Sequence, residues 1–195
     1  MGERDLTPKR GRGRPRDEAA RAALLQAAID LVGERGYRGF SMEDLAARAG
    51  TGKQTIYRWW AGKAEVVLEA LAKQAERQIA ITSTGDPIED LRTFMKATFA
   101  AADPTTVALL KALASEAQVD DAFARTFRTR FIDRRRAALA ECVARARAAG
   151  NLPAGGADEV VVDALFGAMW YRLLITGTPL DAVFADALID AIGGP

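Results

Sequence analysis

Apolar residues recur at intervals of three and four along most of this chain, which is the period of an α-helix. The first complete stripe lies within residues 17–35 and consists of Leu24, Leu25, Ala28, Ile29, Leu31 and Val32. No run of alternating polar and apolar residues is bounded by hairpin signals, and no internal repeat occurs. The pattern predicts an all-α protein of about nine helices.

Residues that cap helices divide this pattern into elements. Asp86-Pro87, Asp103-Pro104 and Thr178-Pro179 each place a capping side chain before a proline. Proline is harmless at the first helical position because its missing N–H has no intrahelical partner there. Beside the helix over 17–35 and two short ones described next, we expect helices over 63–81, 87–101, 104–117, 120–149, 157–176 and 179–192.

The stretch Phe40–Lys63 holds two short helices in close succession. An acid follows Ser41 after three residues, the spacing of a reciprocal N-terminal cap, and Gly50 suits the left-handed conformation that ends a helix. Thr51 and Gln54 repeat the spacing, so a second helix is expected to begin there with Thr51 as its cap. Two helices with so brief a turn cross steeply, as in a helix-turn-helix unit. Together with the first helix they would share a small core of Leu24, Ile29, Phe40, Leu45, Ile56 and Trp60.

The second short helix is rich in side chains that donate to phosphates, read base edges or stack, namely Lys53, Gln54, Thr55, Tyr57, Arg58 and Trp59. These residues predict a DNA-reading unit. An alternative is that Lys53 and Gln54 are ordinary solvated helix residues. Ser41 and Thr51 would likewise be caps whether or not DNA is present.

Composition and charge narrow the function. The chain has 195 residues and lacks histidine, which excludes Ser-His, Cys-His and histidine–metal sites, so we expect no enzyme, no catalytic residues, no cofactor and no metal. A single cysteine, no secretory signal and no membrane span favour a cytoplasmic protein. Residues 1–63 carry a net charge of +5 and residues 64–195 carry −4, so only residues 1–63 are expected to bind a polyanion.

Residues 1–16 contain glycine, proline and arginine but almost nothing apolar, which predicts a disordered basic arm. Arg12 and Arg14 lie in the sequence Arg-Gly-Arg-Pro, the core of an AT-hook, whose arginines enter a narrow A·T minor groove. The alternative is a basic tail that only touches phosphates.

The run from Gly36 to Gly50, then Lys53-Gln-Thr-Ile-Tyr57, then Trp60-Ala-Gly-Lys63, resembles the tetracycline-repressor (TetR) family of bacterial regulators. The close resemblance covers about residues 20–70. It implies a homodimeric transcriptional repressor with a helix-turn-helix domain over 17–63 and an effector-binding and dimerisation domain over 64–195.

The resemblance also implies roles for individual residues. Thr51, Lys53, Gln54 and Thr55 would begin the recognition helix in the major groove, with Lys53 on guanine and Gln54 on adenine. The residues expected at phosphates are Ser41, Tyr57 and Lys63, the last at the N-terminus of the fourth helix. Arg58 and Trp59 occupy positions that vary within the family and would lie near the DNA backbone. Trp60 corresponds to a buried aromatic residue of the family.

The resemblance further suggests that the domain over residues 64–195 binds a small effector. Candidate pocket residues are Phe94, Met95, Phe127, Cys142, Met169 and Trp170, although each suits an ordinary core equally well. The basic run Arg134-Arg135-Arg136 is interpreted as a solvated face. Because few charges interrupt the apolar surface, the expected effector is lipophilic and uncharged or weakly polar.

Helices 157–176 and 179–192 are apolar on more than one face, so two copies of each would form a twofold four-helix dimer interface. The leading hypothesis is a repressor that binds a pseudo-palindromic operator as a homodimer and is released by its effector. The alternative is an architectural DNA-binding protein that responds to no ligand.

Overall fold

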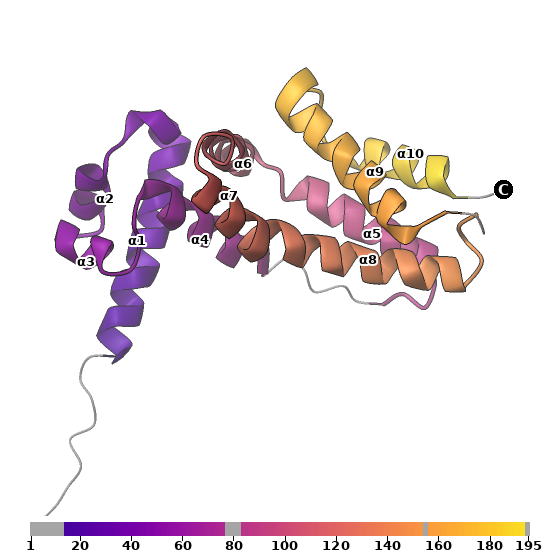
Figure 1. Ribbon diagram of the computed structural model, residues 1–195, viewed down its shortest axis with the longest axis horizontal. Coiled ribbons are helices and arrows are strands. Elements are labelled where there is room, and N and C mark those ends of the chain that lie inside the picture. Colours follow the sequence, from indigo (N-terminus) through magenta and orange to yellow (C-terminus); the bar gives the residue numbers. More distant parts are fainter. Residues whose placement is uncertain (1–13, 77–82, 154–155, 194–195) are drawn as a thin grey trace, which may run out of the picture.

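The computed structural model describes residues 14–76, 83–153 and 156–193, and in these ranges it consists of helices without a strand. Figure 1 shows an elongated molecule with α1–α4 at one end and α5, α8, α9 and α10 at the other. The elements are α1 (Arg14–Arg35), η1 (Tyr37–Gly39), α2 (Met42–Arg48), α3 (Lys53–Tyr57), α4 (Lys63–Glu76), α5 (Pro87–Ala100), α6 (Pro104–Glu116), α7 (Asp121–Phe127), η2 (Arg128–Ile132), α8 (Asp133–Ala148), α9 (Asp158–Tyr171), η3 (Arg172–Thr176) and α10 (Ala182–Ile192). None of the helices in the described ranges has the length and apolarity needed to cross a membrane.

Two π-helical segments join the longer elements. The segment η2 connects α7 to α8 without a break, so the single helix expected over 120–149 is confirmed, and η3 extends α9 to Thr176. Counting each continuous helix once and leaving out the 3-10 turn η1, the described residues form nine helices. The all-α fold class is confirmed.

Most helix starts are where the capping residues predicted them. Asp86 and Asp103 accept hydrogen bonds from main-chain N–H groups of α5 and α6, each with proline next in the chain. The start expected for the last helix is wrong, because α10 begins at Ala182 with Asp181 as its cap. The Thr178 hydroxyl is instead hydrogen-bonded to the Thr176 hydroxyl, 2.8 Å away, and so does not cap a helix.

The buried side chains form two clusters. The first joins α1–α4 to α6, α7 and η2 and includes five of the six residues expected in the small front core; Ile29 is partly buried against it. The second lies among α5, α8, α9 and α10. Since the first cluster continues from the front helices into α6 and α7, the domain boundary after residue 63 stays a prediction.

A row of side chains at intervals of four runs along α7, η2 and α8. The rings of Phe123, Phe127 and Phe131 stack in sequence, with centroids 6.2 and 5.8 Å apart. In an α-helix, residues four apart drift by about 40° per step because four residues exceed one turn. The π turn η2 holds an additional residue per turn and takes up this drift, so the row continues to Phe131 and on to Arg135.

Candidate DNA-binding surface and ligand cavity

The short helices α2 and α3 owe their positions to local hydrogen bonds. The Ser41 Oγ accepts from the Asp44 N–H at 3.2 Å while the Asp44 carboxylate accepts from the Ser41 N–H at 2.8 Å, which confirms the predicted cap. The cap predicted at Thr51 is wrong, because α3 begins after Gly52 with no side-chain bond. The Thr51 N–H donates to the Ala46 carbonyl at 3.0 Å, so Thr51 belongs to the turn that ends α2.

The predicted DNA-contacting residues of this unit share one exposed region. Lys53, Gln54, Tyr57 and Arg58 are exposed on α3 and its C-terminus, and Tyr57 is 55% accessible although it is a large aromatic residue. Ser41 is exposed, whereas Thr51, Thr55 and Trp59 are partly buried. Of the two arginines assigned to the minor groove, Arg12 lies outside the described residues. Arg14 opens α1, so the last three residues of the predicted arm are helical.

Two cations of α3 and its C-terminus are paired with carboxylates of the protein itself. Lys53 pairs with Glu43 of α2, and this hydrogen bond is the largest influence that lowers the pKa of Glu43. Arg58 lies 3.1 Å from Asp17 and covers the ring of Trp59. Exposed pairs of this kind contribute little to stability, so a phosphate can displace the carboxylate at little cost.

Lys63, at the start of α4, is tied to the segment before α2. Its Nζ donates to the carbonyl oxygens of Tyr37, at 2.7 Å, and Phe40, at 2.9 Å, and lies over both of their rings. Burial lowers the pKa of this ammonium group. Its predicted phosphate contact stays a prediction, and in this conformation the side chain fastens α4 to the DNA-reading unit.

A second tie fixes α4 against α1 and the end of α3. The Glu69 carboxylate accepts from the indole N–H of Trp60 at 2.9 Å and from Arg21 Nε at 2.8 Å. Trp60 is 2% exposed, which confirms its assignment to the core. Any displacement of α4 therefore acts on α1–α3 through Lys63 and Glu69.

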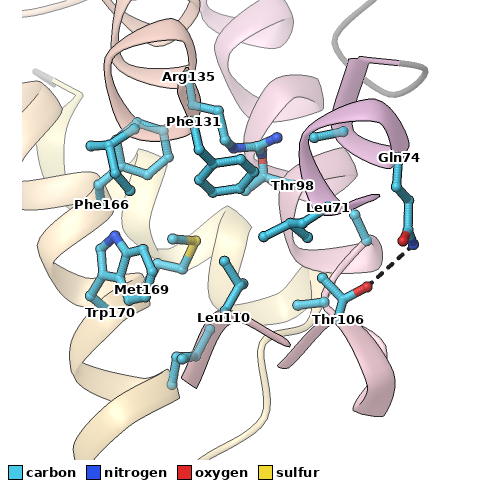
Figure 2. A pocket seen from close by; sticks show the side chains of 15 residues that line it. Leu71, Gln74, Thr98, Thr106, Leu110, Phe131, Arg135, Phe166, Met169 and Trp170 are labelled. Atoms are coloured by element: carbon cyan, nitrogen blue, oxygen red, sulfur yellow. Dashed lines mark hydrogen bonds between the residues drawn. The ribbon is translucent and has the colours of Figure 1, made fainter. Parts of the chain in front are cut away.

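A mostly apolar cavity lies where the two buried clusters meet. Its interior volume is about 50 Å³, and it opens to solvent on one side. Figure 2 shows the side chains around it, which come from α4, α6, α9 and the α7–η2–α8 helix, among others. Its lining consists of Leu71, Gln74, Ala75, Thr98, Ala101, Ala102, Thr106, Leu110, Phe131, Ile132, Arg135, Phe166, Met169, Trp170 and Leu173.

Two of the six predicted pocket residues, Met169 and Trp170, line this cavity. The other four are not in its lining. Phe94, Met95 and Cys142 are packed inside the second cluster, while Phe127 is stacked inside the first. Their apolar character was legible in the sequence, but the direction each faces depends on how the helices cross.

Arg135 contradicts the interpretation of residues 134–136 as a solvated face. It is partly buried, lines the cavity and donates from Nη2 to the Thr98 hydroxyl at 3.0 Å. Burial lowers the pKa of its guanidinium. Its neighbour Arg136 pairs with Asp163 and does not line the cavity. The sequence held one signal for this difference, since Arg135 follows Phe127 and Phe131 at intervals of four.

Comparison with known proteins gives matches over nearly the whole chain. Residues 24–70 match the family model of bacterial regulatory proteins of the tetR family, and residues 81–192 match the tetracyclin repressor-like C-terminal domain. The chain is 34% identical over 186 residues to the HTH-type transcriptional regulator YdeS of Bacillus subtilis, covering 94% of this chain and 93% of that protein. It is 32% identical to the DNA-binding transcriptional repressor TetR of Mycobacteroides abscessus, covering 91% and 93%. The crystal structure of the TetR family transcription regulator SCO0332 superposes with a TM-score of 0.71 at 32% identity, covering 87% of this chain and 94% of that one.

Proposed function

Because the chain belongs to the tetR family of bacterial transcriptional regulators, we propose that it is a repressor that binds a pseudo-palindromic operator as a homodimer and is released by a small lipophilic effector. In this proposal α3 enters the major groove, with Lys53 and Gln54 at base edges and Ser41, Tyr57 and Lys63 at phosphates.

The observation that carries release by an effector is the position of α4. Leu71, Gln74 and Ala75 of this helix line the cavity, and Lys63 at its start is bonded to the segment before α2. A ligand that fits the cavity better when α4 is tilted would favour a different spacing between the α3 helices of the two protomers. Operator half-sites lie about 34–36 Å apart, so a changed spacing weakens simultaneous contact with both.

Support for a dimer comes from exposed apolar side chains at the C-terminal end. Of the seven large hydrophobic residues exposed in the described ranges, five lie on α9, η3 and α10: Val160, Tyr171, Leu174, Ile175 and Val183. Such a concentration on neighbouring helices is typical of an interaction surface. A twofold arrangement of α9 and α10 with their copies would cover it.

The proposal can be tested by selecting binding sites from random DNA with the purified full chain. We expect an inverted repeat, bound by two protomers with an affinity at least about 10³-fold above that for random sequence at the same salt concentration. A ratio near one would instead support architectural DNA binding. Compounds that raise the thermal unfolding midpoint are then added to the operator complex, and the release mechanism fails if every one of them leaves operator affinity unchanged.

A further inference from the structure

Arg135 places a cation in the cavity that has no counter-ion among the described residues. Within residues 14–76, 83–153 and 156–193, no carboxylate lies within ion-pair distance of Arg135, and the Thr98 hydroxyl is the only group that accepts from its guanidinium. The guanidinium carbon also lies over the ring of Phe131, 5.7 Å from the ring centroid. Figure 2 shows the guanidinium beside Thr98 and the Phe131 ring, on the wall of the cavity.

The surroundings of this cation are almost entirely apolar. The other lining residues carry no charge, and Phe166, Met169 and Trp170 of α9 lie together on the side of the cavity away from Gln74. Arginine stays protonated at any physiological pH, so burial cannot neutralise it and instead leaves an unsatisfied charge. A guanidinium presents several N–H donors in one plane, and a single hydroxyl acceptor leaves most of them available.

We propose that the cavity binds a monocarboxylate with an apolar body, and that the carboxylate accepts a forked pair of hydrogen bonds from Arg135. This assignment rests on the proposed function only in taking the cavity as the effector site. It changes the expected effector from an uncharged molecule to an organic anion. The lone guanidinium balances one negative charge, which favours a carboxylate over a phosphate monoester with nearly two.

Isothermal titration calorimetry of the full chain with probes of equal tail length tests which head-group charge the cavity prefers. The probes are dodecanoate, dodecanol, dodecylamine and dodecyl phosphate, each below its micelle-forming concentration. We expect saturable binding of one dodecanoate per chain, at least about tenfold tighter than dodecanol, because a hydrogen bond to a charged group contributes more than a neutral one. Decanoate and hexadecanoate are measured beside it to allow for tail length. The proposal is overturned if none of the three carboxylates binds saturably, or if the alcohol, the amine or the phosphate binds more tightly than dodecanoate.

Variants of the same helix separate a binding role from a structural one. Arg135→Met should weaken the tightest carboxylate by about ten- to a hundredfold and leave dodecanol unchanged, while Arg135→Lys should retain part of the affinity. The matched control is Arg136→Met, which removes a neighbouring arginine that is paired with Asp163 outside the cavity and should leave all probes unchanged. Equal loss in both variants would contradict the assignment.

Stability without a ligand gives an independent readout. Because Arg135 is a partly buried charge with no counter-ion in the described part of the chain, Arg135→Met should unfold at the same temperature as the parent chain or higher. A lower unfolding temperature together with unchanged carboxylate binding would mean that the residue is structural only. Operator affinity is measured separately: carboxylate binding through Arg135 that leaves the operator complex intact would overturn ligand release but not the binding site.

Discussion

The ammonium group of Lys63 donates a hydrogen bond to the main-chain oxygen of Phe40, 2.9 Å away. Phe40 directly precedes the residue that caps α2, so the first residue of α4 holds the start of the DNA-reading unit. A side chain expected at a phosphate is therefore also an internal tie.

Replacing Lys63 by methionine should remove this tie. Two carbonyl oxygens lose their donor, so we expect the free energy of unfolding to fall by about 1–2 kcal/mol in urea titrations. Operator and random DNA should both bind more weakly. If the ammonium also contacts a phosphate, the slope of the logarithm of the binding constant against the logarithm of salt concentration should decrease by about one unit. Unchanged stability would contradict the structural role of Lys63.

Ser41 and Thr51 should respond differently to alanine. Ser41→Ala removes a reciprocal cap and should cost about 1 kcal/mol of stability. Thr51→Ala should stay within about 0.5 kcal/mol of the parent chain, since Thr51 caps no helix, yet it should weaken operator binding. Urea unfolding and fluorescence anisotropy measure the two effects. A large stability loss in Thr51→Ala would contradict the separation.

Glu43 competes with DNA for Lys53. Glu43→Gln should raise affinity for DNA by about two- to fivefold, the equivalent of an exposed ion pair. Glu34→Gln is the matched control, because it removes an equal charge from a pair with Arg48, which is outside the predicted contacts. If both variants raise affinity equally, the cause is general charge removal rather than release of Lys53.

The exposed face of α9, η3 and α10 should be sensitive to a single charge. Val183→Glu places a carboxylate on it and should convert the proposed dimer to monomer in sedimentation velocity runs, with a loss of operator affinity. Val119→Glu changes an equally exposed valine between α6 and α7 and should leave the dimer intact. Dimers that persist in Val183→Glu would move the interface elsewhere.

Asp90 should make stability depend on acid pH. Its carboxylate accepts from the Thr84 N–H at 2.6 Å, from the Thr84 hydroxyl at 2.8 Å and from the Ser83 hydroxyl at 3.0 Å, and these bonds lower its pKa. A lowered folded-state pKa contributes stability above the unfolded value, near pH 4, and this contribution is lost as the pH falls through the folded value. Asp90→Asn should therefore be less stable than the parent chain at pH 7, and the difference should shrink toward pH 2. A difference that does not change with pH would exclude the carboxylate as its source.

The features that could be read from the sequence are those decided within one helical turn. The Ser41 cap, the starts of α5 and α6 and the burial of Trp60 depend on neighbours a few residues away or on a strong apolar pattern. Thr51 and Thr178 fitted the same local rules but failed. The main-chain N–H of Thr51 closes the turn that ends α2, and the hydroxyl of Thr178 bonds to Thr176.

The lining of the cavity depends on contacts between distant helices and was only partly predictable. Met169 and Cys142 look alike as apolar helix residues, but Met169 faces the junction of the two clusters and Cys142 faces the inside of one. Arg135 and Arg136 are identical neighbours, and a rotation of one residue along the helix separates a cavity wall from an exposed ion pair.

The π turn η2 sets the rotation of α8 relative to α7 and therefore decides which residue of α8 lines the cavity. If residues 128–132 were wound as a plain α-helix instead, everything after them would turn by about 100° relative to α7, because the π turn takes up one additional residue. A different residue of α8 would then face the cavity, although no side chain of its lining had been substituted. A change in how η2 is wound can therefore alter the charge of the cavity, whereas deleting its additional residue would keep α8 in phase.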